Sequence, residues 1–349
     1  MGSSVKKTPV LAVSMGDGNG IGPEIILKSL HKLLGPDHNN PGGQNLPGFM
    51  IFACPETLKF YAEKLEIPIF WKESTGTVAP ESGHVHLISV SSSPVEIRPG
   101  EITALAGKAA MTAIASAVDC CMDGTADALV TAPISKEAIH LAGYNVPGHT
   151  EFLAEHTGSS SVGMMLVNDI MRVGLATIHI PLRDVPSALT PELLEEKLLL
   201  FHRYLADSFS IQSPRIAVLG LNPHAGDGGV IGNEEADIIS PVIRTLENKG
   251  MDITGPWPAD GFFASKSYEN TDMVLAMYHD QGLIPLKMTG FGGGVNITTG
   301  LPIIRTSPDH GTAFSLAGQN QADAGSMEKA LHLARELAEK RTSRRKKAL

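Results

Sequence analysis

The chain has 349 residues, of which 42% are hydrophobic and 19% are charged, and its formal net charge is −9. This length and composition are those of a globular protein with one large α/β unit or two lobes. The negative charge excludes a global positive field that would recruit nucleic acid or anionic lipid, so any anionic ligand must be held by local cations.

The elements predicted along the chain repeat one order: an apolar run, a polar or glycine-rich turn, and then a helical pattern. Strands alternating with helices predict an α/β fold with a largely parallel sheet. The apolar runs are strand-sized, and the N-terminus lacks a signal-peptide core, so we expect no transmembrane helix and a cytoplasmic protein. The predicted strands are 9–15, 127–130, 215–221 and 272–278, with a helix starting at Thr190-Pro191 and a mobile loop at 35–48.

The three cysteines, Cys54, Cys120 and Cys121, show no ligand spacing, and their odd number argues against a disulfide framework.

Three histidines follow apolar runs at the point where each run ends. His179 closes MRVGLATIH, His224 follows RIAVLGL, and His279 follows DMVLAMY. Ligand sites in open parallel sheets lie beyond the carboxyl ends of the strands, so these residues could converge. Three imidazole ligands are typical of a catalytic metal site with an open position, whereas hydrogen-bonded polar residues at strand ends are the alternative.

Two glycine-rich stretches could bring a ligand close to the backbone. Residues 17–24 (DGNGIGPE) could hold an anion at a helix N-terminus or form a tight structural turn, and they lack the full dinucleotide spacing. In the second stretch, 287–313, Lys287 and Arg305 could bind a phosphate or carboxylate. The segment PGHTE (147–151) adds an imidazole and a hydroxyl before a helix.

Together these segments resemble the family of 4-hydroxythreonine-4-phosphate dehydrogenase, an enzyme of vitamin B6 synthesis. They occur in the family's order and span nearly the whole chain. The matching segments are MGDGNGIGPEI (15–25), VTAPISKEAI (130–139), PGHTEF (147–152), HIPLRD (179–184), LGLNPHAGDGG (219–229), GPWPADGFF (255–263), AMYHDQGLIPLK (276–287), GFGGGVNITTGLPIIRTSPDHGTA (290–313) and ADAGS (322–326).

The resemblance implies a two-lobed α/β/α fold similar to isopropylmalate dehydrogenase, with a mostly parallel sheet and an active cleft between the lobes. It implies an NAD-side lobe of residues 1–135 plus 295–349, and a metal, substrate and dimerisation lobe of residues 136–294. It also implies a homodimer with a shared active site.

The resemblance assigns site residues by role. The implied ligands of a divalent metal, with zinc expected and Mg, Co, Ni or Mn as alternatives, are His179, His224 and His279. The implied substrate-binding residues are His149, Thr150, Lys287, Asn296 and Arg305. The residues implied to lie near NAD are Gly292, Gly294, Asp309, His310 and Gly311. Asp260 and Lys136 are two candidate general bases.

The implied reaction is NAD-dependent oxidation of the C3 hydroxyl of 4-hydroxythreonine 4-phosphate, followed by decarboxylation to 3-amino-2-oxopropyl phosphate. Relatives with the same motifs act on 4-phospho-D-threonate, on 4-phospho-D-erythronate, or on a diol dicarboxylate derived from an aromatic acid, so the substrate stays open. The chain also departs from the family, because Asp17-Gly18-Asn19-Gly20 stands where Asp-Pro-Ala-Gly or Glu-Pro-Ala-Gly is common.

Rival functions of other classes are a phosphate acyltransferase-like enzyme, a ligand sensor, and a metal-dependent aldolase or hydrolase. The three histidines count against the acyltransferase, and the lack of a DNA-binding segment counts against the sensor.

Overall fold

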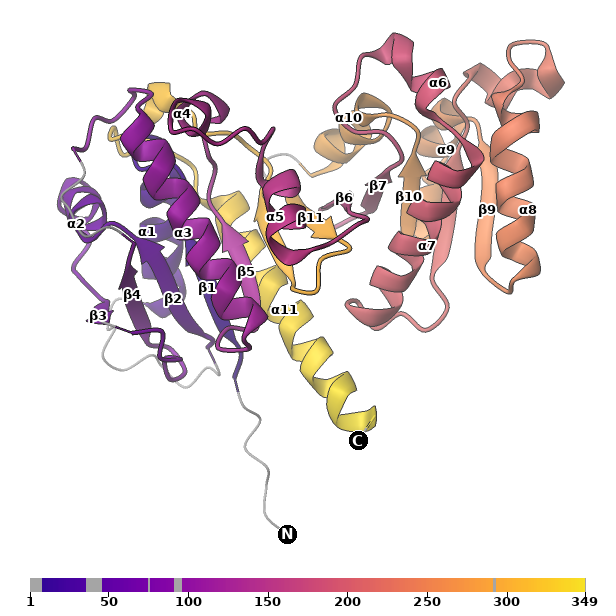
Figure 1. Ribbon diagram of the computed structural model, residues 1–349. Helices are drawn as coiled ribbons and strands as arrows, with labels where there is room; N and C mark the ends of the chain where they lie inside the picture. Colours follow the sequence, from indigo (N-terminus) through magenta and orange to yellow (C-terminus); the bar gives the residue numbers. More distant parts are fainter. Residues whose placement is uncertain (1–7, 36–45, 75, 91–95, 291–292, 349) are drawn as a thin grey trace. The chain divides into compact units, whose positions relative to one another are not determined.

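The chain divides into two compact units, each an α/β body built from strands and helices (Figure 1). The computed structural model describes residues 8–35, 46–74, 76–90, 96–290 and 293–348, so most of the loop expected at 35–48 lies outside the described residues. Unit 1 comprises residues 1–160 and 301–349, and unit 2 comprises residues 161–300. The sequence placed the boundaries after residues 135 and 294.

Unit 1 contains six parallel strands in the order β3-β4-β2-β1-β5-β12. Strand β1 lies between β2 and β5, so the chain order reverses there, as in doubly wound sheets. The strands are β1 (Val10–Ser14), β2 (Gly48–Ala53), β3 (Lys72–Ser74), β4 (Val85–Ser89), β5 (Ala128–Thr131) and β12 (Arg305–Pro308).

Helices cover both faces of this sheet, with α3 on one face and α1 and α11 packed together on the other (Figure 1). The helices are α1 (Gly22–Leu34), α2 (Pro55–Lys64), α3 (Ala104–Met122), α4 (Lys136–Leu141), α5 (His149–Thr157) and α11 (Gly325–Ala348), with a 3₁₀ turn at Phe314–Leu316.

Helix α3 is long and apolar enough to pass a length-and-composition test for a membrane span, and it is the one such helix among the described residues. It packs in the core of unit 1, where Met111, Ile114 and Val118 are fully buried. Its Lys108 and Asp119 lie within the same nineteen residues. This pattern is that of a buried core helix.

Unit 2 contains six strands in the order β11-β6-β7-β10-β8-β9. The pairs from β7 to β9 are parallel, whereas β6 runs antiparallel to both β7 and β11. The strands are β6 (Gly163–Val167), β7 (Arg172–Leu175), β8 (Arg215–Leu219), β9 (Asp252–Trp257), β10 (Met273–Ala276) and β11 (Val295–Thr299). The expected α/β fold with a mostly parallel sheet is confirmed.

Helix α7 of unit 2 begins where the sequence signal at Thr190-Pro191 predicts. Thr190 caps α7 by accepting a hydrogen bond from the Leu193 amide, and Pro191 is its first residue. The helices are α6 (Val185–Ala188), α7 (Pro191–Asp207), α8 (Ser240–Asn248), α9 (Ala259–Ala264) and α10 (His279–Thr289), with short turns at Leu182–Asp184, Pro223–Gly229, Glu235–Ile239 and Ser267–Asn270.

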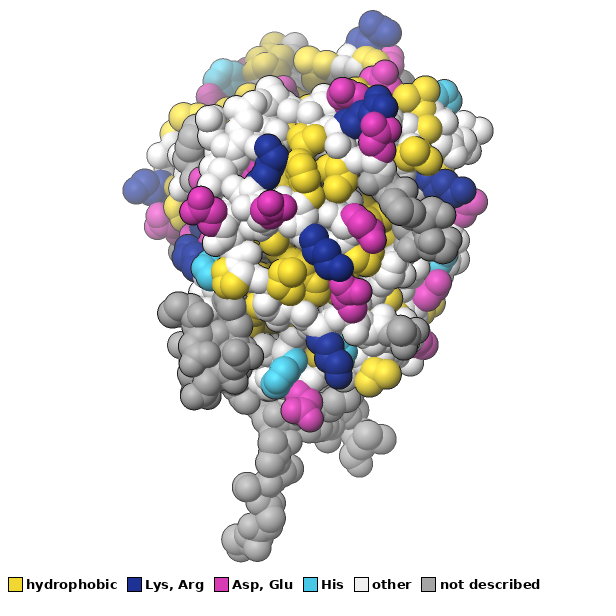
Figure 2. All heavy atoms as spheres, turned by 90° about the vertical axis from the view of Figure 1, so that its left-hand side faces the viewer, with side chains coloured by type: hydrophobic (Ala, Val, Ile, Leu, Met, Phe, Trp, Pro, Cys, Tyr) yellow, Lys and Arg dark blue, Asp and Glu magenta, His cyan; other side chains and the backbone are white. Residues whose placement is uncertain are grey.

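The surface shows charges of both signs. On the face turned toward the viewer in Figure 2, basic and acidic side chains are interspersed. Exposed ion pairs such as Lys59–Glu73, 2.7 Å apart, add to this pattern.

Candidate functional site

The three predicted metal ligands follow three neighbouring strands of unit 2. Strand β10 lies between β7 and β8, and all three run parallel, so their carboxyl ends share one edge of the sheet. His179 follows β7, His224 follows β8, and His279 is the first residue of α10 after β10. This is the edge at which α/β sheets bind ligands.

The structure brings two of these histidines into ring contact. The centroids of the His179 and His279 rings are 5.6 Å apart, with 42° between the ring planes. Nδ1 of His279 lies 2.7 Å from Oδ1 of Asp280. A carboxylate that accepts a hydrogen bond from Nδ1 fixes the tautomer and leaves Nε2 as the lone-pair donor, an arrangement common in metal-binding histidines.

His224 lies in an unusual turn after β8. Its φ is 53°, and the next four residues also have positive φ. The described residues contain no cluster of three His, Cys, Asp or Glu side chains that could hold one metal ion. The donor set suits a divalent ion chemically, and His179 and His279 converge, but His224 does not complete a cluster with them.

The two candidate bases lie in different units. Asp260 is exposed in the first turn of α9 in unit 2, and Lys136 is the exposed first residue of α4 in unit 1.

Unit 1 holds a buried cationic group at the sequence-predicted substrate residue Arg305. This side chain is 2% exposed, and burial lowers the pKa of its guanidinium to about 9. Its Nε and Nη2 donate to Oγ1 of Thr131 at 3.2 and 2.6 Å. Arg305, the first residue of β12, pairs with Leu129 of β5, and Thr131 is the last residue of β5, two positions further along the same strand. Because alternate residues of a strand point to the same face, the Thr131 hydroxyl lies on the face that carries the guanidinium.

His149, the first residue of α5, is half-buried, and its Nε2 is buried without a hydrogen-bond partner among the described residues. The pKa of His149 lies well below its usual value, mainly because the ring is buried and also because of the nearby charge of Arg305. A hydrogen bond with the Ala132 backbone acts in the opposite direction and raises the pKa. The imidazole is therefore neutral at physiological pH. Thr150 follows it in the first turn of α5. A buried guanidinium beside an unpartnered imidazole nitrogen provides donors for an anion.

The other predicted substrate residues lie in unit 2. Lys287 is exposed in the last turn of α10. Asn296, in β11, is half-buried, and its Oδ1 is buried without a hydrogen-bond partner among the described residues. A buried polar atom of this kind calls for a ligand or water, since leaving it unpaired costs free energy.

Of the residues predicted to lie near NAD, Gly292 lies outside the described residues, and Gly294 is buried in unit 2. Asp309, His310 and Gly311 follow β12 in unit 1, where the Asp309 amide donates to Oγ of Ser326 at 3.1 Å. The glycine-rich turn at 17–24 packs beside this loop, because the Ile21 amide donates to the Thr312 carbonyl at 3.0 Å.

The same turn contains a buried acid, Asp17, which is 0% exposed. Its Oδ1 accepts from the Asn19 amide at 2.9 Å, whereas its Oδ2 has no hydrogen-bond partner among the described residues. Burial raises the pKa of Asp17 to about 6, against the lowering effect of the Asn19 amide.

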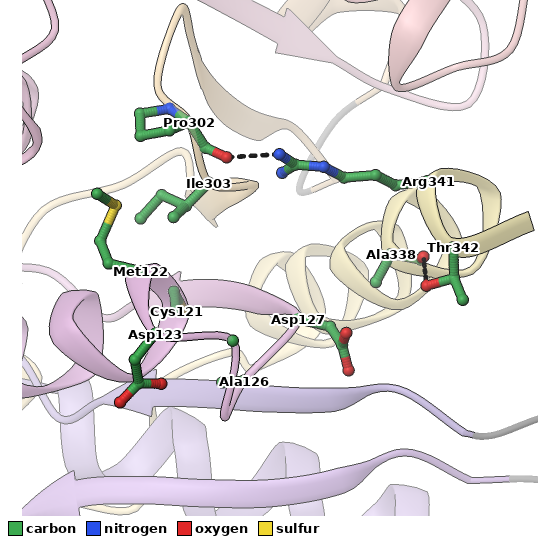
Figure 3. Close-up of a pocket in the computed structure, with 11 residues that line it drawn as sticks. Cys121, Met122, Asp123, Ala126, Asp127, Pro302, Ile303, Ala338, Arg341 and Thr342 are labelled. Carbon is green, nitrogen blue, oxygen red and sulfur yellow. Dashed lines mark hydrogen bonds between the residues drawn. The ribbon is translucent and has the colours of Figure 1, made fainter. Parts of the chain in front are cut away.

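A cavity of about 490 Å³ in unit 1 contains none of the predicted site residues (Figure 3). Its wall includes Cys121 and Asp127 before β5 and Pro302 before β12, together with Arg341 and Thr342 of α11. Nη2 of Arg341 donates to the Pro302 carbonyl at 2.6 Å. The cavity therefore lies at the amino ends of the strands, whereas ligand sites of such sheets lie beyond the carboxyl ends.

Comparisons with known proteins identify the family. The family model described as Pyridoxal phosphate biosynthetic protein PdxA matches residues 49–334. The chain belongs to the PdxA family. The family expected from the sequence motifs is thereby confirmed.

Individual relatives match over nearly the whole chain. A curated 4-hydroxythreonine-4-phosphate dehydrogenase of Prosthecochloris aestuarii is 43% identical over 335 residues, which cover 94% of this chain and 96% of the relative. The crystal structure of the same-named enzyme from Klebsiella pneumoniae has a TM-score of 0.83 and 38% identity, over 97% of this chain and 100% of that one. A terephthalate 1,2-cis-dihydrodiol dehydrogenase from Burkholderia xenovorans has a TM-score of 0.65 and 28% identity, over 94% of this chain and 98% of that one.

The sequence did not point to three residues whose hydrogen bonds position the predicted site residues or the turns that carry them. Thr131 contacts Arg305, while Glu235 and Gln281 bind the backbone around His224 and His279. Thr131 and Gln281 lie in segments that matched the family, whereas Glu235 lies after the segment 219–229. Apart from Met277, which is 4 residues from Gln281, their partners lie 13 to 174 residues away in sequence, which no local pattern reveals.

Proposed function

We propose that this PdxA-family protein is a cytoplasmic, metal- and NAD-dependent dehydrogenase that oxidises 4-hydroxythreonine 4-phosphate at C3 and releases CO₂. The observation that carries the proposal is the pair His179–His279, with Asp280 on His279, at the ligand-binding edge of a sheet in a chain of this family. The product is 3-amino-2-oxopropyl phosphate, an intermediate of pyridoxal phosphate synthesis.

His179, His224 and His279 would hold the divalent metal, with zinc as the expected ion. A bound metal would supply Lewis acidity that lowers the pKa of the substrate hydroxyl, and NAD⁺ would accept the hydride from C3. The role of Asp280 is to hold the His279 ring so that Nε2 faces away from the carboxylate.

A general base must take the hydroxyl proton as the hydride leaves, which turns the C3 alcohol into a ketone. Asp260 and Lys136 are the two candidates, and both are exposed side chains at helix starts. The resulting 3-oxo acid loses its carboxyl group as CO₂, and the electron pair of the broken C–C bond forms an enolate. Protonation of this enolate at C2 gives the ketone product.

The phosphate and carboxylate of the substrate need donors that stay charged or polar when water is excluded. Arg305 keeps its charge at neutral pH because its lowered pKa of about 9 is still above 7. Further hydrogen bonds come from Thr150, Lys287, Asn296 and the neutral imidazole of His149. Asp309, His310 and Gly311, together with Gly292 and Gly294, are proposed to contact NAD.

The first experiment measures NADH absorbance with purified protein, NAD⁺ and a divalent metal. We expect chelator-sensitive NADH formation with 4-hydroxythreonine 4-phosphate. Preference for 4-phospho-D-threonate or 4-phospho-D-erythronate would move the enzyme to sugar-acid catabolism. Preference for a diol dicarboxylate would align it with the terephthalate dihydrodiol dehydrogenase. No NADH from any of these substrates would overturn the dehydrogenase proposal and favour an acyltransferase-like activity.

We also propose that the protein works as a homodimer. Several large apolar side chains of unit 2 are exposed in the single chain, and burying them in an interface would be favourable. Among them are Leu182 (67% exposed), Val230 (82%) and Met288 (78%). Light scattering should give twice the chain mass of 37.0 kDa, and the monomer mass at micromolar concentration would contradict the proposal.

A further inference from the structure

The turn that carries His224 has a backbone that L-residues rarely adopt. Residues 224–228 have φ values of 53°, 51°, 82°, 45° and 65° in succession. His224, Ala225 and Asp227 are not glycines, so the left-handed conformation crowds their Cβ atoms. A turn of this kind persists only where the surrounding structure holds it.

The carboxylate of Glu235 stabilises the left-handed turn through hydrogen bonds to the residues that precede it. Its Oε1 accepts hydrogen bonds from the amides of Leu221 and Asn222 at 2.8 and 2.7 Å, and its Oε2 accepts from Nδ2 of Asn222 at 2.9 Å. The residue is 4% exposed and therefore shielded from competing water. These bonds fix the two residues that lead from β8 into the turn.

Local structure on both sides brings Glu235 to this place. Glu235 begins the π-helical turn Glu235–Ile239, and such turns are frequent at functional sites. On the other side, Gly226 has a φ of 82°, and a Cβ added to it would lie 2.7 Å from Oε2 of Glu235. The missing side chain at Gly226 therefore makes room for the carboxylate inside the turn.

Gln281 ties the same turn to the neighbouring strand. Its Nε2 donates to the carbonyl of Gly220 at 2.6 Å, and its Oε1 accepts from the amide of Met277 at 2.7 Å. Gly220 follows β8 and Met277 follows β10. One side chain thus connects the strand ends that carry His224 and His279.

We propose that Glu235 is a positioning residue for the metal site, with Gln281 as its partner, and that neither is a ligand. Both oxygens of Glu235 accept hydrogen bonds from donors of the turn, so its effect on a bound ion would come through the placement of His224. This inference rests on the proposed metal-binding function. It adds the residues that set the geometry of the third ligand.

The test compares zinc affinity of full-length metal-free proteins by competition with a chromophoric chelator. Glu235→Gln removes the charge and places an amide against Nδ2 of Asn222, so the variant should bind zinc about 10- to 100-fold more weakly. Glu234→Gln is the matched control, because Glu234 also accepts from Nδ2 of Asn222, at 2.7 Å, whereas the amides of Leu221 and Asn222 donate to Glu235. The control should bind zinc within about twofold of wild type.

Two further readouts separate positioning from a general structural role. In Glu235→Gln, hydrogen exchange should quicken at the amides of Leu221 and Asn222 but not in β6, and saturating zinc should restore kcat. If Glu235→Gln does not fold, Gln281→Met carries the test, because it removes both hydrogen bonds that join the strand ends. That variant should also weaken zinc binding.

The outcomes distinguish this inference from the function on which it rests. If the wild-type protein binds no zinc at stoichiometric amounts, the metal-dependent function fails. If wild type binds zinc, His224→Ala does not, and both Glu235→Gln and Gln281→Met bind like wild type, the function stands and the positioning role is overturned.

Discussion

The Thr131 hydroxyl is the acceptor for two hydrogen bonds from the buried guanidinium of Arg305. A buried cation interacts strongly with each polar group that faces it, because little water competes. We therefore expect the Thr131 oxygen to contribute to the orientation of Arg305 and of an anion bound to it.

Replacing Thr131 with valine keeps the shape and removes the acceptor. Hydrogen bonds to charged groups are worth about 1.5–3 kcal/mol, so KM for a phosphorylated substrate should rise about tenfold or more. Thr131→Ser should restore KM, because the hydroxyl returns. Steady-state kinetics on both variants is the measurement, and equal KM values in valine and wild-type proteins would refute the role of Thr131.

The buried acid Asp17 predicts a pH-dependent component of stability. Its pKa is about 6 in the folded protein and 3.8 in the reference state, so the folded state binds more protons between these values. Stability due to this group is therefore full below about pH 4 and is lost as the pH rises through about 6. The loss is roughly 3 kcal/mol of unfolding free energy.

Asp17→Asn cannot ionise, so it should lack this component. Urea unfolding of both proteins at pH 4.5 and 7.5 should show that the variant gains stability relative to wild type as the pH rises. The comparison cancels the contributions of the other titrating groups. A constant difference between the two proteins would mean that the pKa of Asp17 is not raised.

At the scale of elements, α10 lies close to the sheet because of one glycine. A Cβ added to Gly282 would lie 2.5 Å from Cγ1 of Val173 and 2.9 Å from Cβ of Ala276. Alanine normally stabilises a helix relative to glycine by about 1 kcal/mol. Here the contact with β7 and β10 should outweigh that preference.

Gly282→Ala should therefore destabilise the protein by about 1–3 kcal/mol, through overpacking, and displace His279 at the start of α10. Gly261→Ala in α9 is the control, because a Cβ there would meet no atom within 4 Å. Denaturant unfolding of the two variants measures the effect. A stabilised Gly282→Ala protein would show that α10 can shift at little cost.

The sequence predicted these elements unevenly. Apolar runs located β7, β8 and β10 and placed the histidines beyond their ends, because burial of parallel strands leaves a clear pattern. The predicted strand 215–221 is shorter in the structure and ends at Leu219, since Glu235 draws residues 221 and 222 into the turn. Local propensity does not predict the left-handed turn at 224–228 or the π-helical turn at Glu235–Ile239. Both depend on the hydrogen bonds by which Glu235 joins the two segments.

At the scale of the whole molecule, a bound metal should stabilise the fold by mass action. A ligand present at 100 times its Kd adds about 2.7 kcal/mol to the unfolding free energy. Zinc should therefore raise the melting temperature of the metal-free protein, and a chelator should reverse the shift. The same rise in His224→Ala would mean that zinc stabilises the protein from another site.

The domain organisation was harder to predict than the fold class. The alternation of strands and helices indicated α/β units, and the family resemblance indicated two of them. The expected boundary after residue 135 left α4 and α5 with the second lobe, but these helices pack against α3 in unit 1. The connection at 158–162 contains glycine and serine but no strong break, so composition alone does not mark it.

The discontinuity of unit 1 has a consequence for the protein as it leaves the ribosome. Strand β12 and helix α11 belong to unit 1 but come after residue 300, so the nascent chain cannot complete that unit until these residues have been synthesised. Unit 2 is one continuous segment and can finish first, although it begins later. At 5–20 residues per second, the first 160 residues wait roughly 7–30 s for their last strand, exposed to chaperones and proteases during that time.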